Sequence, residues 1–119
     1  MNEKNRQHFK QRLTEWLEEL NAQNGETLKE LQDYQLRQPD GVDLAMEESR
    51  LKFLLRIRGR ESRLIGKIQT ALEDIEQGVY GICQICGRNI GLKRLEARPV
   101  THHCIRCKVA LELQERLRG

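Results

Sequence analysis

The chain has 119 residues, of which 33% are charged and only 4% aromatic, and its formal net charge is +3 at pH 7. A chain of this size and composition can bury only a modest hydrophobic core, so we expect an elongated helical protein with one small domain. No run approaches the roughly 18 apolar residues of a membrane-spanning helix, and no apolar signal segment opens the chain. These absences argue against a membrane protein and against secretion. The charge is uneven, because residues 78–119 hold eight basic and three acidic residues.

A helical repeat dominates the first third of the chain. Its members recur at alternating steps of four and three, which places them on one face of a helix. The pair Asn24-Gly25 could end a helix, but the repeat resumes at once, so we expect the helix to continue through it. The repeat comprises Leu13, Leu17, Leu20, Asn24, Thr27, Leu31 and Tyr34.

A turn is predicted at residues 37–45. Pro39 disfavours helix in the residue before it, and Asp40-Gly41 has the composition of a turn. Asp43 is placed to cap the first free N–H groups of a following helix. Taken alone, Asp40 reads as a turn residue and Asp43 as a plain N-cap.

A second helical segment follows and ends at Gln77-Gly78, a normal C-terminal stop. Two helices of about 34 residues, each roughly 50 Å long, joined by a turn predict an antiparallel coiled-coil hairpin over residues 1–77. Arg58 and Ser62 loosen the middle of the second apolar face, and Arg58 with Glu61 reads as a solvent-exposed i,i+3 pair. The apolar face comprises Leu51, Leu54, Leu55, Ile65, Ile68, Leu72 and Ile75.

Two Cys-x2-Cys pairs, Cys83 with Cys86 and Cys104 with Cys107, are separated by seventeen residues. This spacing predicts one structural Zn²⁺ held by four thiolates, with no coordination position left for water. The neighbouring His102 and His103 could replace a thiolate, but adjacent histidines next to a cysteine ligand are expected on the surface. A short amphipathic helix with Val109, Leu111, Leu113 and Leu117 should follow and pack on the base. The predicted fold is therefore all-α: a coiled-coil hairpin, then a C4 zinc-finger base with a C-terminal helix over residues 78–119.

The residues leave two other functions open. The basic last third fits a nucleic-acid-binding zinc ribbon, although its terminal helix mixes arginines with glutamates and the chain lacks aromatic residues suited to stacking on bases. The cysteine pairs could also form a thiol-redox sensor. We find no nucleophile with a base and no Gly-rich phosphate loop, so we do not expect an enzyme.

Three segments carry a resemblance to a known family. They are residues 40–45 (DGVDLA) at the expected turn, residues 78–83 (GVYGIC) and residues 86–99 (CGRNIGLKRLEARP). Together they resemble the DksA/TraR family of C4-type zinc-finger proteins, which bind bacterial RNA polymerase. Two departures are the lack of the N-terminal extension of the longer members and His103, where an aliphatic residue is usual before Cys104.

The resemblance implies a cytoplasmic, monomeric transcription regulator. Its hairpin would enter the secondary channel of RNA polymerase, and the tip residues Asp40, Asp43 and Ala45 would alter open complexes at ribosomal RNA and amino-acid promoters without cleaving the transcript. We expect no membrane association and no sequence-specific DNA binding.

The resemblance also implies a possible effector, guanosine tetraphosphate (ppGpp). Lys67, Arg98 and Lys108 fall on positions that bind this alarmone in the family. Arg60, Leu64 and Glu112 fall near the contact with the rim of the channel. The alternative for the basic run at residues 50–67 is an ordinary solvated helix face.

Overall fold

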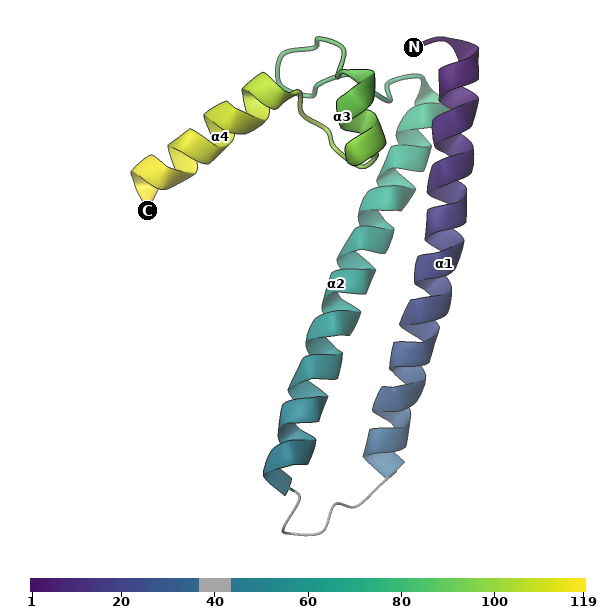
Figure 1. Ribbon diagram of the computed structural model, residues 1–119, viewed down its shortest axis with the longest axis vertical. Coiled ribbons are helices and arrows are strands. Elements are labelled where there is room, and N and C mark those ends of the chain that lie inside the picture. The colour runs from purple at the N-terminus through teal and green to yellow at the C-terminus, as the bar shows by residue number, and fades with distance from the viewer. Residues whose placement is uncertain (37–43) are drawn as a thin grey trace. The chain divides into compact units, whose positions relative to one another are not determined.

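The computed structural model describes residues 1–36 and 44–119, with Leu44 described by its backbone alone (Figure 1). Within these ranges the chain forms four helices, and its only β pairing is an isolated bridge between Ile82 and Asn89. The all-α prediction is confirmed. The helices are α1 (Glu3–Leu36), α2 (Leu44–Gln77), α3 (Leu92–Ala97) and α4 (Ile105–Arg118).

The described residues divide into two compact units. The hairpin unit comprises residues 14–69, and the base unit comprises residues 1–13 together with residues 70–119. None of the helices in the described ranges combines the length and the apolarity needed to cross a membrane.

Helix α1 runs without a break through Asn24-Gly25, as the repeat predicted. A Cβ atom placed on Gly25 would meet nothing within 4 Å. The glycine therefore serves no close approach between helices, and the apolar contacts on either side of it are sufficient to keep the helix continuous.

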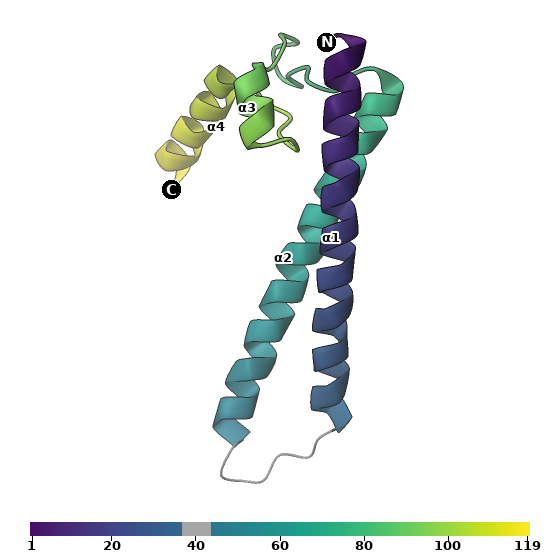
Figure 2. The same cartoon turned by 45° about the vertical axis from the view of Figure 1, so that its right-hand side comes forward.

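In the hairpin unit, α1 and α2 lie side by side and run in opposite directions (Figures 1 and 2). The predicted apolar faces meet: Leu20, Leu31, Leu54 and Ile68 are all buried. Because propensity alone gives little stability to a single long helix, this shared apolar face is the main source of hairpin stability.

A polar layer interrupts this apolar face. Thr27 is only 9% exposed, and its hydroxyl lies 2.9 Å from a carboxylate oxygen of Glu61 on α2 and 3.0 Å from the carbonyl oxygen of Gln23. Asn24 Oδ1 and Arg58 Nη1 are also buried, and neither has a hydrogen-bond partner among the described residues. The centre of the hairpin is therefore polar on both helices.

The prediction that Arg58 and Glu61 form a solvent-exposed pair is wrong. Both residues are half-buried, and Ser62 is exposed. Glu61, and not Ser62, occupies the inner position because a glutamate carboxylate can reach the Thr27 hydroxyl of the opposite helix.

The base unit has a hydrophobic core of its own. The core joins the start of α1 and the end of α2 to the zinc-finger segment, and the rings of Phe9 and Tyr80 lie 5.6 Å apart. The Tyr80 hydroxyl donates a 2.8 Å hydrogen bond to the Pro99 carbonyl, and burial raises the pKa of Tyr80. The core residues are Phe9, Leu13, Ala71, Ile75, Tyr80, Ile90 and Leu95.

Polar contacts in the base unit reinforce this core. Glu96 of α3 accepts hydrogen bonds from Arg12 at its carboxylate (2.7 Å) and at its backbone carbonyl (2.6 Å), and its carboxylate lies 2.7 Å from His8 Nε2. Lys10 pairs with Glu76 at 3.0 Å and lowers the pKa of that carboxyl group. These contacts attach α1 to both α3 and the end of α2.

The C-terminal helix α4 is present as predicted, but its expected packing is wrong. None of its residues is buried, and the Val109 and Leu113 side chains are more than half exposed. The apolar residues of α4 therefore add little to the core of the base.

Candidate functional site

The first cysteine pair lies on a tight turn whose backbone bonds are closed locally. The Gly87 N–H donates to the Cys83 carbonyl at 3.0 Å, and the Cys83 N–H donates to the Arg88 carbonyl at 2.8 Å. Gly87 has a φ of +74°, a conformation that glycine adopts without strain. The shape of this turn therefore requires a glycine at position 87, directly after Cys86.

The second pair lies at the start of α4. Cys104 is the N-cap residue of this helix, and its carbonyl accepts the N–H of Lys108 at 3.0 Å. A further backbone bond, from Gln84 N–H to the His102 carbonyl at 2.9 Å, joins the two cysteine-bearing segments. Both pairs are therefore positioned by backbone hydrogen bonds.

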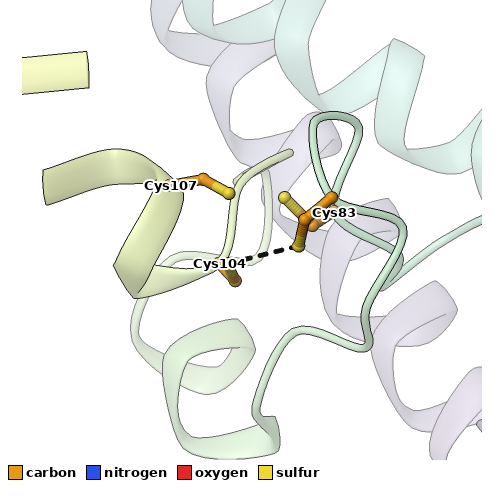
Figure 3. Close-up of side chains that lie close together, drawn as sticks. Cys83, Cys104 and Cys107 are labelled. Carbon is orange, nitrogen blue, oxygen red and sulfur yellow. Dashed lines mark hydrogen bonds between the residues drawn. The ribbon is translucent and has the colours of Figure 1, made fainter. Parts of the chain in front are cut away.

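The four thiols come together as predicted. Their Sγ atoms all lie within 4.8 Å of one another, and those of Cys86 and Cys104 are 3.8 Å apart. Figure 3 shows the sulfur atoms of Cys83, Cys104 and Cys107 gathered at one point, the first on a loop and the others at the start of α4. A tetrahedral site with Zn–S bonds of about 2.3 Å needs sulfurs about 3.8 Å apart, so this donor set fits Zn²⁺.

The electrostatics of the cluster also fit a cation. Backbone N–H groups, chiefly that of Cys86, lower the pKa of Cys83 to about 5. The hydrogen bond with Cys104 raises the pKa of Cys107 to about 12. Four thiolates this close repel one another, and a bound Zn²⁺ supplies the charge that allows all four to ionise. The site is a structural C4 zinc centre.

The two histidines beside the second pair are half-buried, so their predicted surface location is wrong. His102 Nε2 lies 3.5 Å from a carboxylate oxygen of Asp74 on α2. The His103 carbonyl accepts a 2.9 Å hydrogen bond from Arg94 Nε. The His102 side chain therefore lies beside Asp74, and the backbone of His103 is held by Arg94.

The remaining predicted residues lie in separate places. Ala45 is exposed in the first turn of α2, whereas Asp40 and Asp43 lie outside the described residues. Arg60, Leu64 and Lys67 together line a hollow of about 500 Å³ in the hairpin unit.

The other three residues lie in the base unit. Arg98 is the C-cap of α3, and Lys108 pairs with Glu112 at 4.0 Å on α4. The predicted ppGpp and channel-rim residues are thus divided between the hairpin unit and the base unit, and their binding roles remain predictions.

Comparison with known proteins identifies the family. Residues 5–75 match the family described as DnaK suppressor protein DksA, N-terminal domain, and residues 78–112 match the prokaryotic dksA/traR C4-type zinc finger. The chain belongs to the DksA/TraR family. Its zinc-finger match spans all four cysteines, in agreement with the metal centre described above.

Individual relatives cover almost the whole chain. RNA polymerase-binding transcription factor DksA of Salmonella typhimurium is 40% identical over 98% of this chain and 77% of the relative. The structure of transcription factor DksA2 from Pseudomonas aeruginosa is 38% identical, covers 97% of this chain and 88% of its own, and has a TM-score of 0.90. RNA polymerase binding protein and transcriptional regulator Dks from Chlamydia trachomatis is 23% identical over 96% of this chain and 94% of its own; its TM-score of 0.57 shows the shared fold alone.

Several residues that shape this DksA-family base were not identified from the sequence. Tyr80 donates a hydrogen bond to the Pro99 carbonyl, and Arg94 donates one to the His103 carbonyl. Each bond links two parts of the zinc-finger segment. A single tyrosine in a glycine-rich turn is a weak signal of burial. The partner of each bond is a backbone carbonyl, which carries no side-chain signal in the sequence.

Proposed function

We propose that this protein is a bacterial transcription regulator that binds RNA polymerase and is not an enzyme. The observation that carries this proposal is the 40% identity, over 98% of the chain, to a protein named RNA polymerase-binding transcription factor DksA. The match includes both the helical hairpin and the zinc-finger base. Such a partner would place the protein in the cytoplasm.

The proposed mechanism is insertion of the hairpin into the secondary channel of the polymerase. The tip residues Asp40, Asp43 and Ala45 would then act near the active site and shorten the lifetime of open promoter complexes, without transcript cleavage. The exposed position of Ala45, in the first turn of α2, is compatible with a contact of this kind. Zinc would stabilise the base and take no part in chemistry.

We also propose ppGpp as an effector. Lys67, which the family resemblance assigns to this alarmone, lines a hollow of the hairpin unit together with Arg60, Arg63 and the acidic Glu61. Arginine and lysine bind phosphate well. The family resemblance also assigns Arg98 and Lys108 of the base unit to this alarmone, and it places Arg60, Leu64 and Glu112 near the channel rim. The regulator would act as a monomer and would not read a DNA sequence.

The first test measures open-complex lifetime on a ribosomal RNA promoter with purified RNA polymerase. The unmodified protein should shorten the lifetime, and Asp43→Asn should abolish the effect, because asparagine caps a helix about as well as aspartate but carries no charge. Asp33→Asn, an exposed position on α1, is the matched control and should behave like the unmodified protein. No effect of the unmodified protein would refute the proposed function.

A second test addresses the effector. Lys67→Ala and Arg98→Ala should each reduce the additional effect of ppGpp on the same complexes, while the effect without ppGpp persists. Lys29→Ala, an exposed lysine of α1, serves as the control for loss of one positive charge. A full ppGpp response in both variants would exclude this site.

A further inference from the structure

A second basic hollow lies on the zinc finger itself, in the base unit. It has a volume of about 400 Å³ and borders Cys104 and Ile105. Four cationic residues line it: Arg88 from the first cysteine turn, Lys93 and Arg94 from α3, and Arg106 from α4. None of the residues that line it, all within the described range 88–106, is acidic.

The four cationic residues are not equivalent. Arg94 is held by its hydrogen bonds to the His103 carbonyl (2.9 Å) and the Thr101 hydroxyl (3.3 Å), so it forms a fixed part of the wall. The other three are exposed, and none forms an ion pair with any carboxylate of the described chain. Three unneutralised cations around one concavity create a local positive potential that attracts an anion.

The chemistry of the lining favours phosphate groups over an acidic protein surface. Arginine presents a planar fork of N–H donors that matches phosphate oxygens in pairs. Protein–protein interfaces usually centre on aromatic or large apolar anchors, and Ile105 is the one large apolar side chain that lines this hollow. The lining contains no aromatic residue on which a base could stack.

We propose that this hollow binds the sugar–phosphate backbone of nucleic acid without reading its sequence. Arg88, Lys93 and Arg106 would contact successive phosphates, with Arg94 fixing the wall behind them. The proposal stands apart from the polymerase-binding function, because the four cationic residues of this hollow are not among those assigned to the tip, to ppGpp or to the channel rim. A backbone ligand fits better than a single nucleotide, because cations surround the hollow, whereas its lining has no aromatic residue to stack on a base and only one amide side chain, Asn89.

The test uses the zinc-loaded, full-length protein in the absence of polymerase. Fluorescence anisotropy with a labelled DNA duplex of about 20 base pairs is measured at salt concentrations from about 50 to about 200 mM. Affinity that depends on phosphate contacts falls steeply over this range. The double variant Arg88→Ala with Arg106→Ala should bind at least about tenfold more weakly at low salt. It should also reduce the slope of log affinity against log salt by about 2, since each phosphate contact contributes about 0.9.

The control removes the same charge elsewhere, through Lys4→Ala with Lys29→Ala, two exposed lysines of α1. It should retain duplex affinity within about twofold, because a general charge effect is small compared with the loss of direct phosphate contacts. Zinc content and thermal melting confirm that both double variants are folded. Equal losses in both double variants, or a loss in neither, would overturn the proposal.

Two further arms separate other occupants. Tripolyphosphate that binds the unmodified protein in calorimetry, when the duplex does not, would assign the hollow to free polyphosphate and overturn the backbone assignment. If the Arg88/Arg106 double variant loses affinity for polymerase and not for the duplex, the hollow faces an acidic protein surface and the proposal is likewise wrong.

Discussion

Leu95 provides a quantitative test of how the zinc-finger base is held together. It lies in α3 and is fully buried, at 0% exposure. Replacing it with alanine removes three carbon atoms from the core, worth about 0.8 kcal/mol each, or roughly 2.4 kcal/mol in lost transfer free energy. The cavity left behind adds to this, so we expect Leu95→Ala to destabilise the base by about 3–4 kcal/mol.

The assay is hydrogen exchange with mass spectrometry on the zinc-loaded protein, because exchange reports the opening free energy of each region separately. Peptides from residues 80–100 should exchange faster in the variant, whereas peptides from residues 15–35 should change little. Leu92→Ala is the matched control on the same helix, and Leu92 is 49% exposed. We expect the control to cost about 1 kcal/mol, since only about half of the Leu92 side chain is buried. An equal cost for the two leucines would refute the packing argument.

Four other changes have definite expected outcomes. Tyr80→Phe removes the donor to the Pro99 carbonyl and should lower the unfolding free energy in urea by about 1–3 kcal/mol, with the m-value unchanged. Gly25→Ala should raise it by about 0.5–1 kcal/mol, because the helix interior has room for a methyl group there; a loss of stability would contradict this. Gly81→Ala should destabilise more than Gly87→Ala in the same titration. Both glycines have positive φ, but only at Gly81 would the added carbon meet side chains, the nearest atom being 2.9 Å away. Removing zinc with a chelator should reduce the helical circular dichroism signal, and returning zinc should restore it. Full helicity without metal would argue against a structural role.

The regular parts of the fold could be predicted from the sequence because each follows from a local pattern. The repeat from Leu13 to Tyr34 predicted α1, and the spacing of the cysteines predicted a cluster that the structure confirms. The hairpin followed from two apolar faces that could only be buried against each other, whereas residues 37–43 of the predicted turn lie outside the described residues. These features depend on neighbours in the sequence or on a strict metal geometry.

The features that were missed depend on distant partners. Glu96 meets His8 and Arg12 across separations of 88 and 84 residues, and nothing near Glu96 in the sequence indicates these contacts. Glu61 was assigned to solvent because its nearest apparent partner, Arg58, lies on the same helix. Its inward position depends on the hydroxyl of Thr27 on the opposite helix, 34 residues away in the sequence.

The polar layer has a consequence for how the two helices find their alignment. If α2 slid along α1 by one heptad, Thr27 would face Leu54 or Ile68, and Glu61 would be placed against Leu20 or Tyr34 without a hydroxyl partner. An unpaired buried polar group costs about 1–3 kcal/mol, and a charged one costs more. The paired register of α1 and α2 is therefore selected by the polar layer in the middle of the hairpin unit, through contacts between the described helices alone.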